Sequence, residues 1–131
     1  MTTVSGYLKE VGEVMSRAVV AADEAETVGE IRDLMMSNAL RNVPVLDPEG
    51  HPIGVISASD LIDTLPEETP IGAVMVTDVH AIGAENSVAD AASMMLENYV
   101  HHLVVVDDRM RTIGVVSAFD LLGEVADMAD R

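Results

Sequence analysis

The sequence predicts an α/β fold, α+β by some schemes, made of two copies of one β-α-β-β-α unit. The first observation behind this prediction is an internal repeat, because residues 11–65 align without a gap with residues 71–125. The second is a helix-start signal in each copy, and the third is a pair of short β-branched runs that follows it. A unit of about 50 residues is too small to bury its own sheet, so we expect the copies to pack about a pseudo-two-fold axis.

The two copies repeat one another closely in sequence. The run GVISASDL at residues 54–61 returns as GVVSAFDL at residues 114–121. A polar stretch that contains prolines separates the copies and is typical of a linker. We therefore expect this order of segments: an N-terminal segment (1–10), a first repeat (11–62), a linker (63–70), a second repeat (71–122) and a C-terminal tail (123–131).

A helix is expected near the start of each copy. Thr27 and Glu30, like Ser87 and Asp90, have the spacing of a capping box, in which the two side chains satisfy the first N–H groups of a helix. Adjacent methionines, including Met36, are expected in the helix cores. The apolar side chains that recur at helical spacing and are expected to face a core are Val28, Ile31, Met35, Val88, Ala91 and Met95.

Short apolar runs with β-branched residues predict the strands. Turns at 47–50 and 107–110 join the last two strands of each copy, since both begin with an aspartate and are polar. A final helix is expected from 57 towards 65 in the first copy and from 117 towards 128 in the second. The predicted strands are 19–22, 43–47 and 53–57 in the first copy and 79–82, 103–107 and 113–117 in the second.

Composition argues against several classes of function. The chain has 131 residues but no run of about 18 apolar residues, and its start lacks a basic leader, so we expect a soluble, cytoplasmic protein without a membrane partner. It has no cysteine, which excludes disulfides and thiolate metal sites. A net charge of −16 repels a phosphate backbone, and the scarce aromatic residues offer no stacking platform, so nucleic-acid binding is not expected.

A serine three residues before an aspartate ends the last predicted strand of each copy. Ser57 with Asp60, and Ser117 with Asp120, can cap the following helix and complement its dipole. The same groups also suit a ribose that carries a phosphate, because a carboxylate accepts from both hydroxyls of a cis-diol and a helix start offers N–H groups. Gly54 lies in the same strand, where its missing side chain lets a ligand or another backbone approach closely.

The tandem pattern resembles a pair of CBS domains. Its parts in the first copy are V-x-x-V-M at 11–15, the helix start at 27–28, V-P-V-x-D at 43–47 and the run at 54–61, and the second copy repeats them. The second copy is also similar to repeats of the gamma subunit of AMP-activated protein kinase. The resemblance implies two clefts between the paired sheets for an adenosyl ligand such as AMP, ADP, ATP or S-adenosylmethionine, and assembly with a second pair.

The same resemblance assigns roles to particular residues. Asp60 and Asp120 match the ribose-binding aspartates, and Ser57 and Ser117 match the hydroxyl residue beside ribose and phosphate. Strand segments 43–44 and 103–104 match the wall of the base, and the segments around Val20 and His80 match a short strand whose backbone reads the adenine edge. The candidate nucleotide-binding set therefore also contains Val20, Val43, Pro44, His80 and Leu103.

The positions just before the wall of the base depart from the family pattern. The family often has His-Arg or Arg-Arg there as phosphate ligands, whereas this chain has Arg41 with Asn42 and His101 with His102. A neutral imidazole attracts phosphate less than a guanidinium, and protonation near its unperturbed pKa of about 6.5 would restore the attraction. We expect nucleotide affinity to rise between about pH 8 and 6. One alternative is that His101 and His102 lie at the entrance of the strand and have no role in binding. A metal site is the least favoured alternative, because neighbouring side chains of a strand point to opposite faces and cannot easily bind the same ion.

The sequence favours a regulatory module over an enzyme. No nucleophile with a base, carboxylate pair or metal cluster is recognisable, so we expect no catalysis, no metal and no obligatory cofactor. The first interpretation is a homodimer that senses an adenosyl ligand and alters its own assembly or an unknown protein partner. Magnesium-bound nucleotide or cationic S-adenosylmethionine would tolerate the negative charge best. The alternative is a ligand-free scaffold that dimerises through its helices.

Overall fold

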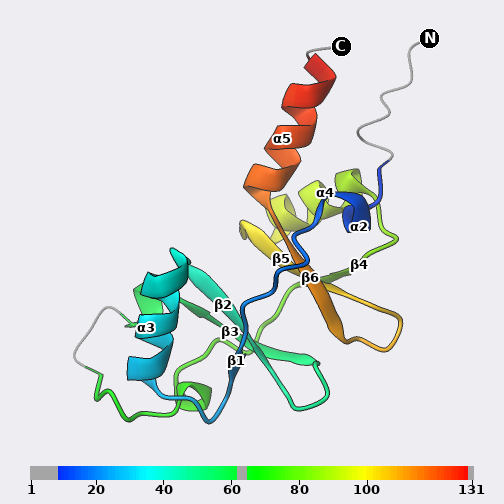
Figure 1. The fold of residues 1–131 in the computed structure, drawn as a ribbon. Helices are drawn as coiled ribbons and strands as arrows, with labels where there is room; N and C mark the ends of the chain where they lie inside the picture. The colour runs from blue at the N-terminus through cyan, green and yellow to red at the C-terminus, as the bar shows by residue number, and fades with distance from the viewer. Residues whose placement is uncertain (1–8, 62–64, 130–131) are drawn as a thin grey trace. The chain divides into compact units, whose positions relative to one another are not determined.

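The computed structural model describes residues 9–61 and 65–129. The chain forms two compact units. One comprises Val20–Val79 and is called the central unit, and the other joins the residues up to Val19 with those from His80 onward and is called the terminal unit. Each unit holds one three-stranded sheet with its own helices (Figure 1). Among the described residues, no helix has the length and apolar content needed to cross a membrane.

The central unit contains the sheet β1-β2-β3. Strand β1 pairs with β2 in parallel, and β2 pairs with β3 in antiparallel fashion. A register shift between Val45 and Leu46 marks a bulge near the hairpin. The elements of this unit are β1 (Ala22–Asp23), α3 (Val28–Asn38), β2 (Asn42–Leu46), β3 (Pro52–Ser57) and two 3₁₀ helices (Ala58–Leu61 and Ile71–Ala73).

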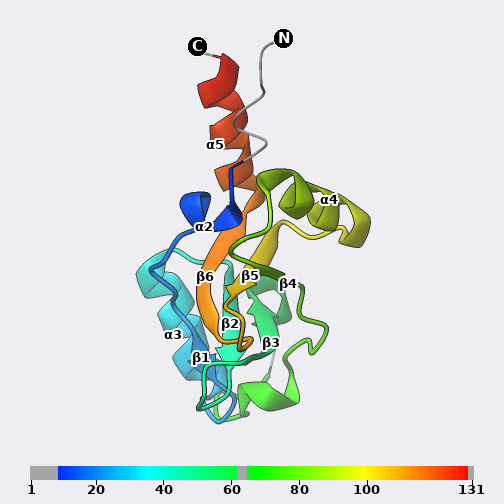
Figure 2. The same cartoon turned by 90° about the vertical axis from the view of Figure 1, so that its right-hand side faces the viewer.

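The terminal unit repeats this topology with a longer final helix. Its sheet has the order β4-β5-β6, with a parallel pair followed by an antiparallel pair. Helix α5 continues directly from the end of β6, and α2 and α4 contact it (Figure 2). The elements are α2 (Val11–Val14), β4 (Ala81–Gly83), α4 (Val88–Asn98), β5 (His102–Val106), β6 (Thr112–Ser117) and α5 (Ala118–Ala129).

The predicted capping boxes are present at the starts of α3 and α4. The Thr27 hydroxyl accepts from the N–H of Glu30 at 3.2 Å, and the Glu30 carboxylate accepts from the N–H of Thr27 at 3.2 Å. Ser87 and Asp90 exchange the same two bonds at 3.0 and 3.2 Å. The predicted helix-core positions are all buried, but Met36 is 81% exposed and its expected burial was wrong. The helix places Met36 one position beyond the buried Met35, which turns it away from the sheet.

The strands agree with the sequence prediction except at the first strand of each copy. Strands β1 and β4 begin later than expected, because Val19 and Val79 each donate to the carbonyl two residues earlier, at 3.0 Å, in a tight turn. After β3 the chain forms a 3₁₀ helix that ends at Leu61, and the rest of the predicted helix up to 64 lies outside the described residues. The predicted final helix of the second copy is confirmed as α5.

The segment before each first strand packs on the sheet of the opposite copy. Ser16 and Val115 exchange two backbone hydrogen bonds of 2.9 and 3.0 Å, so the segment that begins the first copy extends β6 in the terminal unit. Val76 and Val55 exchange the equivalent pair in the central unit, also at 2.9 and 3.0 Å. The blue N-terminal segment that carries α2 lies against this part of the terminal unit (Figure 1). The compact units are therefore offset from the sequence repeat.

Gly54 and Gly114 make this close pairing possible. A Cβ atom at Gly114 would lie 2.9 Å from the Ser16 carbonyl oxygen and 3.0 Å from Met15 Cγ. At Gly54 it would lie 2.8 Å from Met75 Cγ. The close approach expected at Gly54 is thus made by a neighbouring segment of the chain. The strand glycines and the Val-Met pairs of the repeat are complementary parts of one contact.

We predict that Val11→Ala weakens the terminal unit, although Val11 begins the first copy of the repeat. Val11 is fully buried in the core that also contains α4, β5 and β6, and its truncation should cost about 2 kcal/mol. Hydrogen exchange should show faster amide exchange at 88–117 than in the wild type, with 28–57 unchanged. Ile71→Ala is the matched control, because Ile71 is fully buried in the central core and should give the reverse pattern. Loss of protection confined to 28–57 in Val11→Ala would refute the unit assignment.

Gly114→Ala should destabilise the terminal unit by roughly 1 to 3 kcal/mol, the usual cost of overpacking. The added methyl group must displace Met15 or separate Ser16 from β6, because both lie within 3.0 Å of its position. Urea unfolding followed by circular dichroism measures this loss. A urea midpoint of Gly114→Ala equal to that of the wild type would show that the contact of Gly114 with Met15 and Ser16 can accept a methyl group.

Candidate functional site

Ser57 and Asp60 form a local cap at the end of β3. The N–H and hydroxyl of Ser57 both donate to Oδ2 of Asp60, at 2.9 and 2.8 Å. The Ser57 hydroxyl also lies 2.8 Å from that of Ser59. Oδ1 of Asp60 makes no hydrogen bond to the part of the chain that the structure describes. The capping interpretation is therefore confirmed, and it still leaves one carboxylate oxygen for a ligand.

Ser117 and Asp120 form the corresponding cap at the start of α5, but here the serine hydroxyl accepts a hydrogen bond, whereas the Ser57 hydroxyl donates one. Ser117 N–H donates to Oδ2 of Asp120 at 2.8 Å, and Asp120 N–H donates to the Ser117 hydroxyl at 3.0 Å. This reciprocal pair is a capping box, and it starts a full α-helix. In the central unit the hydroxyl instead faces the carboxylate, and the chain continues as a 3₁₀ helix. Both units thus hold an aspartate at the same strand-to-helix turn.

The sheet register brings the phosphate candidates to these turns. Asn42 is paired with Ser57 across β2 and β3, and His102 is paired with Ser117 across β5 and β6. The carbonyl of Arg41 accepts from Ala58 N–H at 2.7 Å, and the carbonyl of His101 accepts from Ala118 N–H at 2.8 Å. These bonds hold the start of β2 beside the end of β3, and the start of β5 beside the end of β6. The register of the hairpin, counted back from its turn, would have identified Asn42 from sequence.

The structure does not bring every candidate side chain to this face. Val43 and Leu103 are 0% and 1% exposed and belong to the hydrophobic cores of their units. Because side chains alternate along a strand, Pro44 and Val104 point to the opposite face, which is also the face of Asn42 and His102. Pro44 and Val104 are themselves buried, and Val104 is 6% exposed.

Val20 and His80 lie immediately before β1 and β4. Both residues are partly buried. The His80 carbonyl accepts from Val104 N–H at 3.1 Å, so this backbone group already extends the ladder beside β4. A carbonyl has two lone pairs, and the second can still accept from an adenine amino group.

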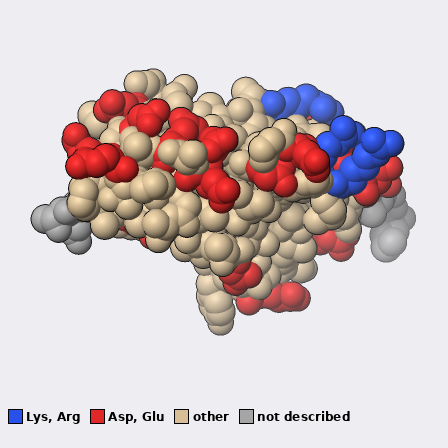
Figure 3. All heavy atoms as spheres, turned by 90° about the horizontal axis from the view of Figure 1, so that it is seen from below, with Lys and Arg blue, Asp and Glu red and all other residues tan. Residues whose placement is uncertain are grey.

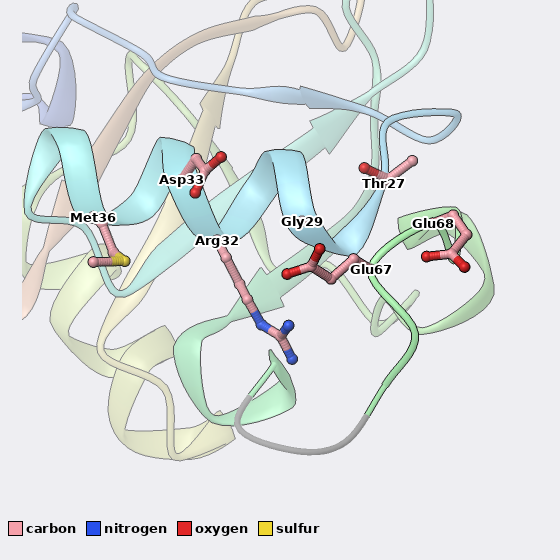
Figure 4. A pocket seen from close by; sticks show the side chains of 7 residues that line it. All are labelled: Thr27, Gly29, Arg32, Asp33, Met36, Glu67 and Glu68. Atoms are coloured by element: carbon pink, nitrogen blue, oxygen red, sulfur yellow. The ribbon is translucent and has the colours of Figure 1, made fainter.

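A separate hollow lies on the outer side of α3. Its lining consists of Thr27, Gly29, Arg32, Asp33, Met36, Glu67 and Glu68 (Figure 4). Arg32 extends from α3 and donates to the Leu61 carbonyl at 2.8 and 3.0 Å, where it caps the end of the 3₁₀ helix. Its lining also includes the acidic residues Asp33, Glu67 and Glu68, so it does not suit a phosphate. Among the described residues, no cluster of three or more histidine or acidic side chains could hold a metal ion.

A family model describes the same repeat. The CBS domain model matches residues 11–67 and 71–127. The chain belongs to the CBS domain family. The matched CBS domains follow the sequence repeat, whereas each compact unit takes its V-x-x-V-M segment from the neighbouring CBS domain.

Relatives of the CBS pair occur within larger proteins. Inosine-5'-monophosphate dehydrogenase of Methanocaldococcus jannaschii is 29% identical over 115 residues, which cover 88% of this chain and 23% of the dehydrogenase. The uncharacterized protein MK0525 of Methanopyrus kandleri is 29% identical over 118 residues, which cover 86% of this chain and 60% of that protein. The chain thus spans less than two thirds of either relative.

Solved structures share the fold at low sequence identity. The CBS domain pair of protein MJ0100, in complex with 5'-methylthioadenosine and S-adenosyl-L-methionine, matches with a TM-score of 0.82 and 21% identity, and 92% and 98% of the two chains are covered. CBSX2 of Arabidopsis thaliana in complex with AMP has a TM-score of 0.82 and 21% identity, with 94% and 99% covered. The CBS domain of a bacterial CNNM/CorC family Mg²⁺ transporter in complex with ATP has a TM-score of 0.86 and 21% identity, with 94% and 91% covered.

The charge of the turns differs between the two units. Desolvation of the ring is the main cause that lowers the pKa of His102, His101 lowers it further, and Asp120 partly opposes both. His102 is therefore mostly neutral at pH 7, and it gains charge at lower pH than its unperturbed value of about 6.5 predicts. Arg41 provides a guanidinium at the equivalent entrance of the central unit. On the face that Figure 3 shows, acidic side chains form several patches and are more frequent than lysine and arginine.

We predict that an NMR titration finds His102 with a pKa below about 6.5. Because the folded-state pKa is lowered, His102 protonation opposes folding, so its contribution to stability is full above the unfolded value and declines as pH falls through the folded one. Asp120→Asn should lower the pKa of His102 further, since it removes the one group that raises it. Asp108→Asn is a control in a distant turn of the same unit. A His102 pKa above 6.5, or one unaffected by Asp120→Asn, would contradict this electrostatic account.

Proposed function

We propose that this CBS-domain pair is a regulatory module that binds an adenosyl ligand at the strand-to-helix turns of Ser57 and Ser117. The observation that carries the proposal is the same geometry in both units: a strand-end serine fixes one oxygen of an aspartate three residues later. The fixed carboxylate presents Oδ1 in a constant orientation, and the two hydroxyls of a ribose are suitable donors to it. Solved CBS-domain relatives with AMP, ATP and S-adenosyl-L-methionine support this choice of ligand.

The groups around each turn are suited to different parts of the ligand. Pro44 and Val104 lie on the sheet face of Asn42 and His102, where both are largely buried, so a base would contact only a small part of either side chain. Arg41 can attract a phosphate in the central unit, whereas His101 and His102 provide weaker attraction in the terminal unit at neutral pH. ADP, a magnesium-bound nucleotide and S-adenosylmethionine remain proposed ligands, and the cationic ligand suits the acidic surface best.

The proposed action is regulatory and not catalytic. A ligand can alter the module only by binding two of its states with different affinity. Binding changes either the assembly of a homodimer or the surface offered to another protein. A ligand-free scaffold is the second candidate, and the exposed apolar side chains Phe119 and Leu122 of α5 favour it, since they present a contact surface without any ligand.

A thermal-shift experiment separates the two functions. AMP, ATP or S-adenosylmethionine at about 100 times its dissociation constant should add roughly 2.7 kcal/mol to the free energy of unfolding. Asp120→Ala and Asp60→Ala should each reduce affinity at one turn by roughly 1 to 3 kcal/mol, because a charged hydrogen bond is lost. Stability that does not respond to any of these ligands would refute the sensing function and leave the scaffold.

Asp90→Ala is the matched control for Asp120→Ala. Both aspartates close a capping box with a serine in the terminal unit, so both substitutions remove equivalent helix-capping bonds. Of the two aspartates, only Asp120 is capped by a serine that ends a sheet strand, Ser117 of β6. We expect both variants to melt earlier, but only Asp120→Ala should lose part of the ligand-induced shift. Equal shifts in the two variants would place the ligand elsewhere.

A further inference from the structure

The two strand-to-helix turns differ in chemistry at the entrances of β2 and β5. In the aligned repeat, Arg41 corresponds to His101. The backbone contact is the same in both units, because each of these residues accepts, through its carbonyl, from the N–H that follows the strand-end serine, at 2.7 and 2.8 Å. The side chains of Arg41 and His101 therefore start from equivalent places beside Ser57 and Ser117. The difference between the turns comes from the side chains and not from the backbone.

The guanidinium of Arg41 is available to a ligand. Two other arginines are held within the chain, since Arg32 donates to the Leu61 carbonyl at 2.8 and 3.0 Å and Arg111 pairs with Asp107 at 3.0 Å. The Arg41 side chain is exposed, and it makes no hydrogen bond or ion pair with any residue that the structure describes. A guanidinium can offer two parallel N–H donors to a phosphate, which makes short, charge-assisted hydrogen bonds.

A second hydroxyl group adds to the difference between the turns. The Ser57 hydroxyl donates to Asp60, so the Ser59 hydroxyl, 2.8 Å away, is the donor between the two serines. Ser59 is exposed, and its O–H can turn from Ser57 to a phosphate oxygen while the cap stays intact. The equivalent residue in the terminal unit is Phe119, which has no hydroxyl. The central turn thus offers a guanidinium and an additional hydroxyl that the terminal turn lacks.

The terminal turn is poor in groups that attract a phosphate. The pKa of His102 is lowered by desolvation of its ring and by His101, and Asp120 only partly opposes these effects. Fewer His102 rings are therefore protonated at pH 7 than in an unperturbed histidine. The N–H of Asp120 already donates to the Ser117 hydroxyl at 3.0 Å, and the Asp120 carboxylate repels an anion. An uncharged or cationic group avoids this repulsion.

We propose that the central turn takes an adenosyl ligand with a 5′-phosphate, whereas the terminal turn takes an adenosyl ligand without a phosphate. This inference rests on the proposed adenosyl sites and assigns a different ligand class to each. Both classes share the ribose, whose hydroxyls can donate to Asp60 or Asp120 alike. The groups near the 5′ position then determine the choice. A cationic 5′ substituent suits the terminal turn further, because Asp120 attracts it.

Occupation of both turns makes the chain a sensor of two ligands. Each ligand acts on the module through its own difference in affinity between two states. If the two turns favour the same state, each ligand tightens the binding of the other by an equal factor. The response then depends on the supply of a phosphorylated and of an unphosphorylated adenosyl compound together.

Adenosine and AMP are the test ligands, because they differ only in the 5′-phosphate. NMR titrations of the wild type at about pH 7.5 follow the amide signals of 57–61 and 117–121, so each turn gives its own dissociation constant. We expect AMP to bind the central turn at least about 10-fold more tightly than adenosine does, and the terminal turn no more tightly than adenosine does. The same preference at both turns would overturn the proposal but leave adenosyl sensing intact. Signals that respond to neither ligand would refute adenosyl sensing itself.

An exchange of the two basic residues tests the cause of the preference. Arg41→His should weaken AMP binding at the central turn by at least about 10-fold and adenosine binding by less than about threefold. His101→Arg should strengthen AMP binding at the terminal turn by a similar factor. Arg109→His, in the β5–β6 turn at the other end of β6, is the matched control and should change neither.

Arg41, His101 and Arg109 are exposed, so all three variants should fold like the wild type, which circular dichroism checks. AMP affinities that stay unchanged in both Arg41→His and His101→Arg would overturn the proposal. Equal losses of adenosine and AMP binding in Arg41→His would also overturn it, because they would show that Arg41 does not recognise the phosphate.

Discussion

Backbone pairing at the outer edge of β3 and β6 is the constraint on which the rest of the structure depends. Each sheet is small, and its last strand would be an open edge without the segment that begins the other copy. The pairs Val55–Val76 and Ser16–Val115 close these edges, and the strand glycines let them form. Each compact unit therefore requires a piece of chain that is covalently joined to the other copy.

The same strands position the candidate ligand groups. Once the β2–β3 register is set, Ser57 lies opposite Asn42, and Ile56 faces the core. A slip by one residue would move the serine to the core face and remove the capped aspartate from the strand end. The same register thus determines both the packing of the core on one face of the sheet and the position of the capped aspartate at the strand end.

The two units share a backbone but differ in the side chains that determine interactions. The central turn has the guanidinium of Arg41 at its strand entrance, whereas burial of the ring lowers the pKa of His102 at the terminal turn. Arg32 extends across to the end of the 3₁₀ helix and donates to the Leu61 carbonyl, whereas the small side chain of the equivalent Ala92 lines a groove beside α5. The two copies of the repeat therefore keep one backbone but present different side chains at equivalent positions.

The sequence by itself determined the features that depend on neighbours a few residues apart. Capping boxes, short β-branched strands, aspartate-initiated turns and the serine–aspartate cap all involve contacts within about four residues, and the structure contains each of them. The family resemblance also came from these local motifs. The roles of Val20, His80 and the other candidate residues in ligand binding stay predictions.

Only the tertiary structure decided which unit each Val-Met segment joins, because backbone hydrogen bonds have no side-chain signature in a repeat whose copies are alike. It also decided that Val43 and Leu103 face the cores, that Met36 is exposed, and that the ring of His102 is desolvated enough to lower its pKa. These outcomes depend on contacts between residues distant in sequence. Spacing along the chain specifies a strand or a helix, but burial and charge depend on what packs against it.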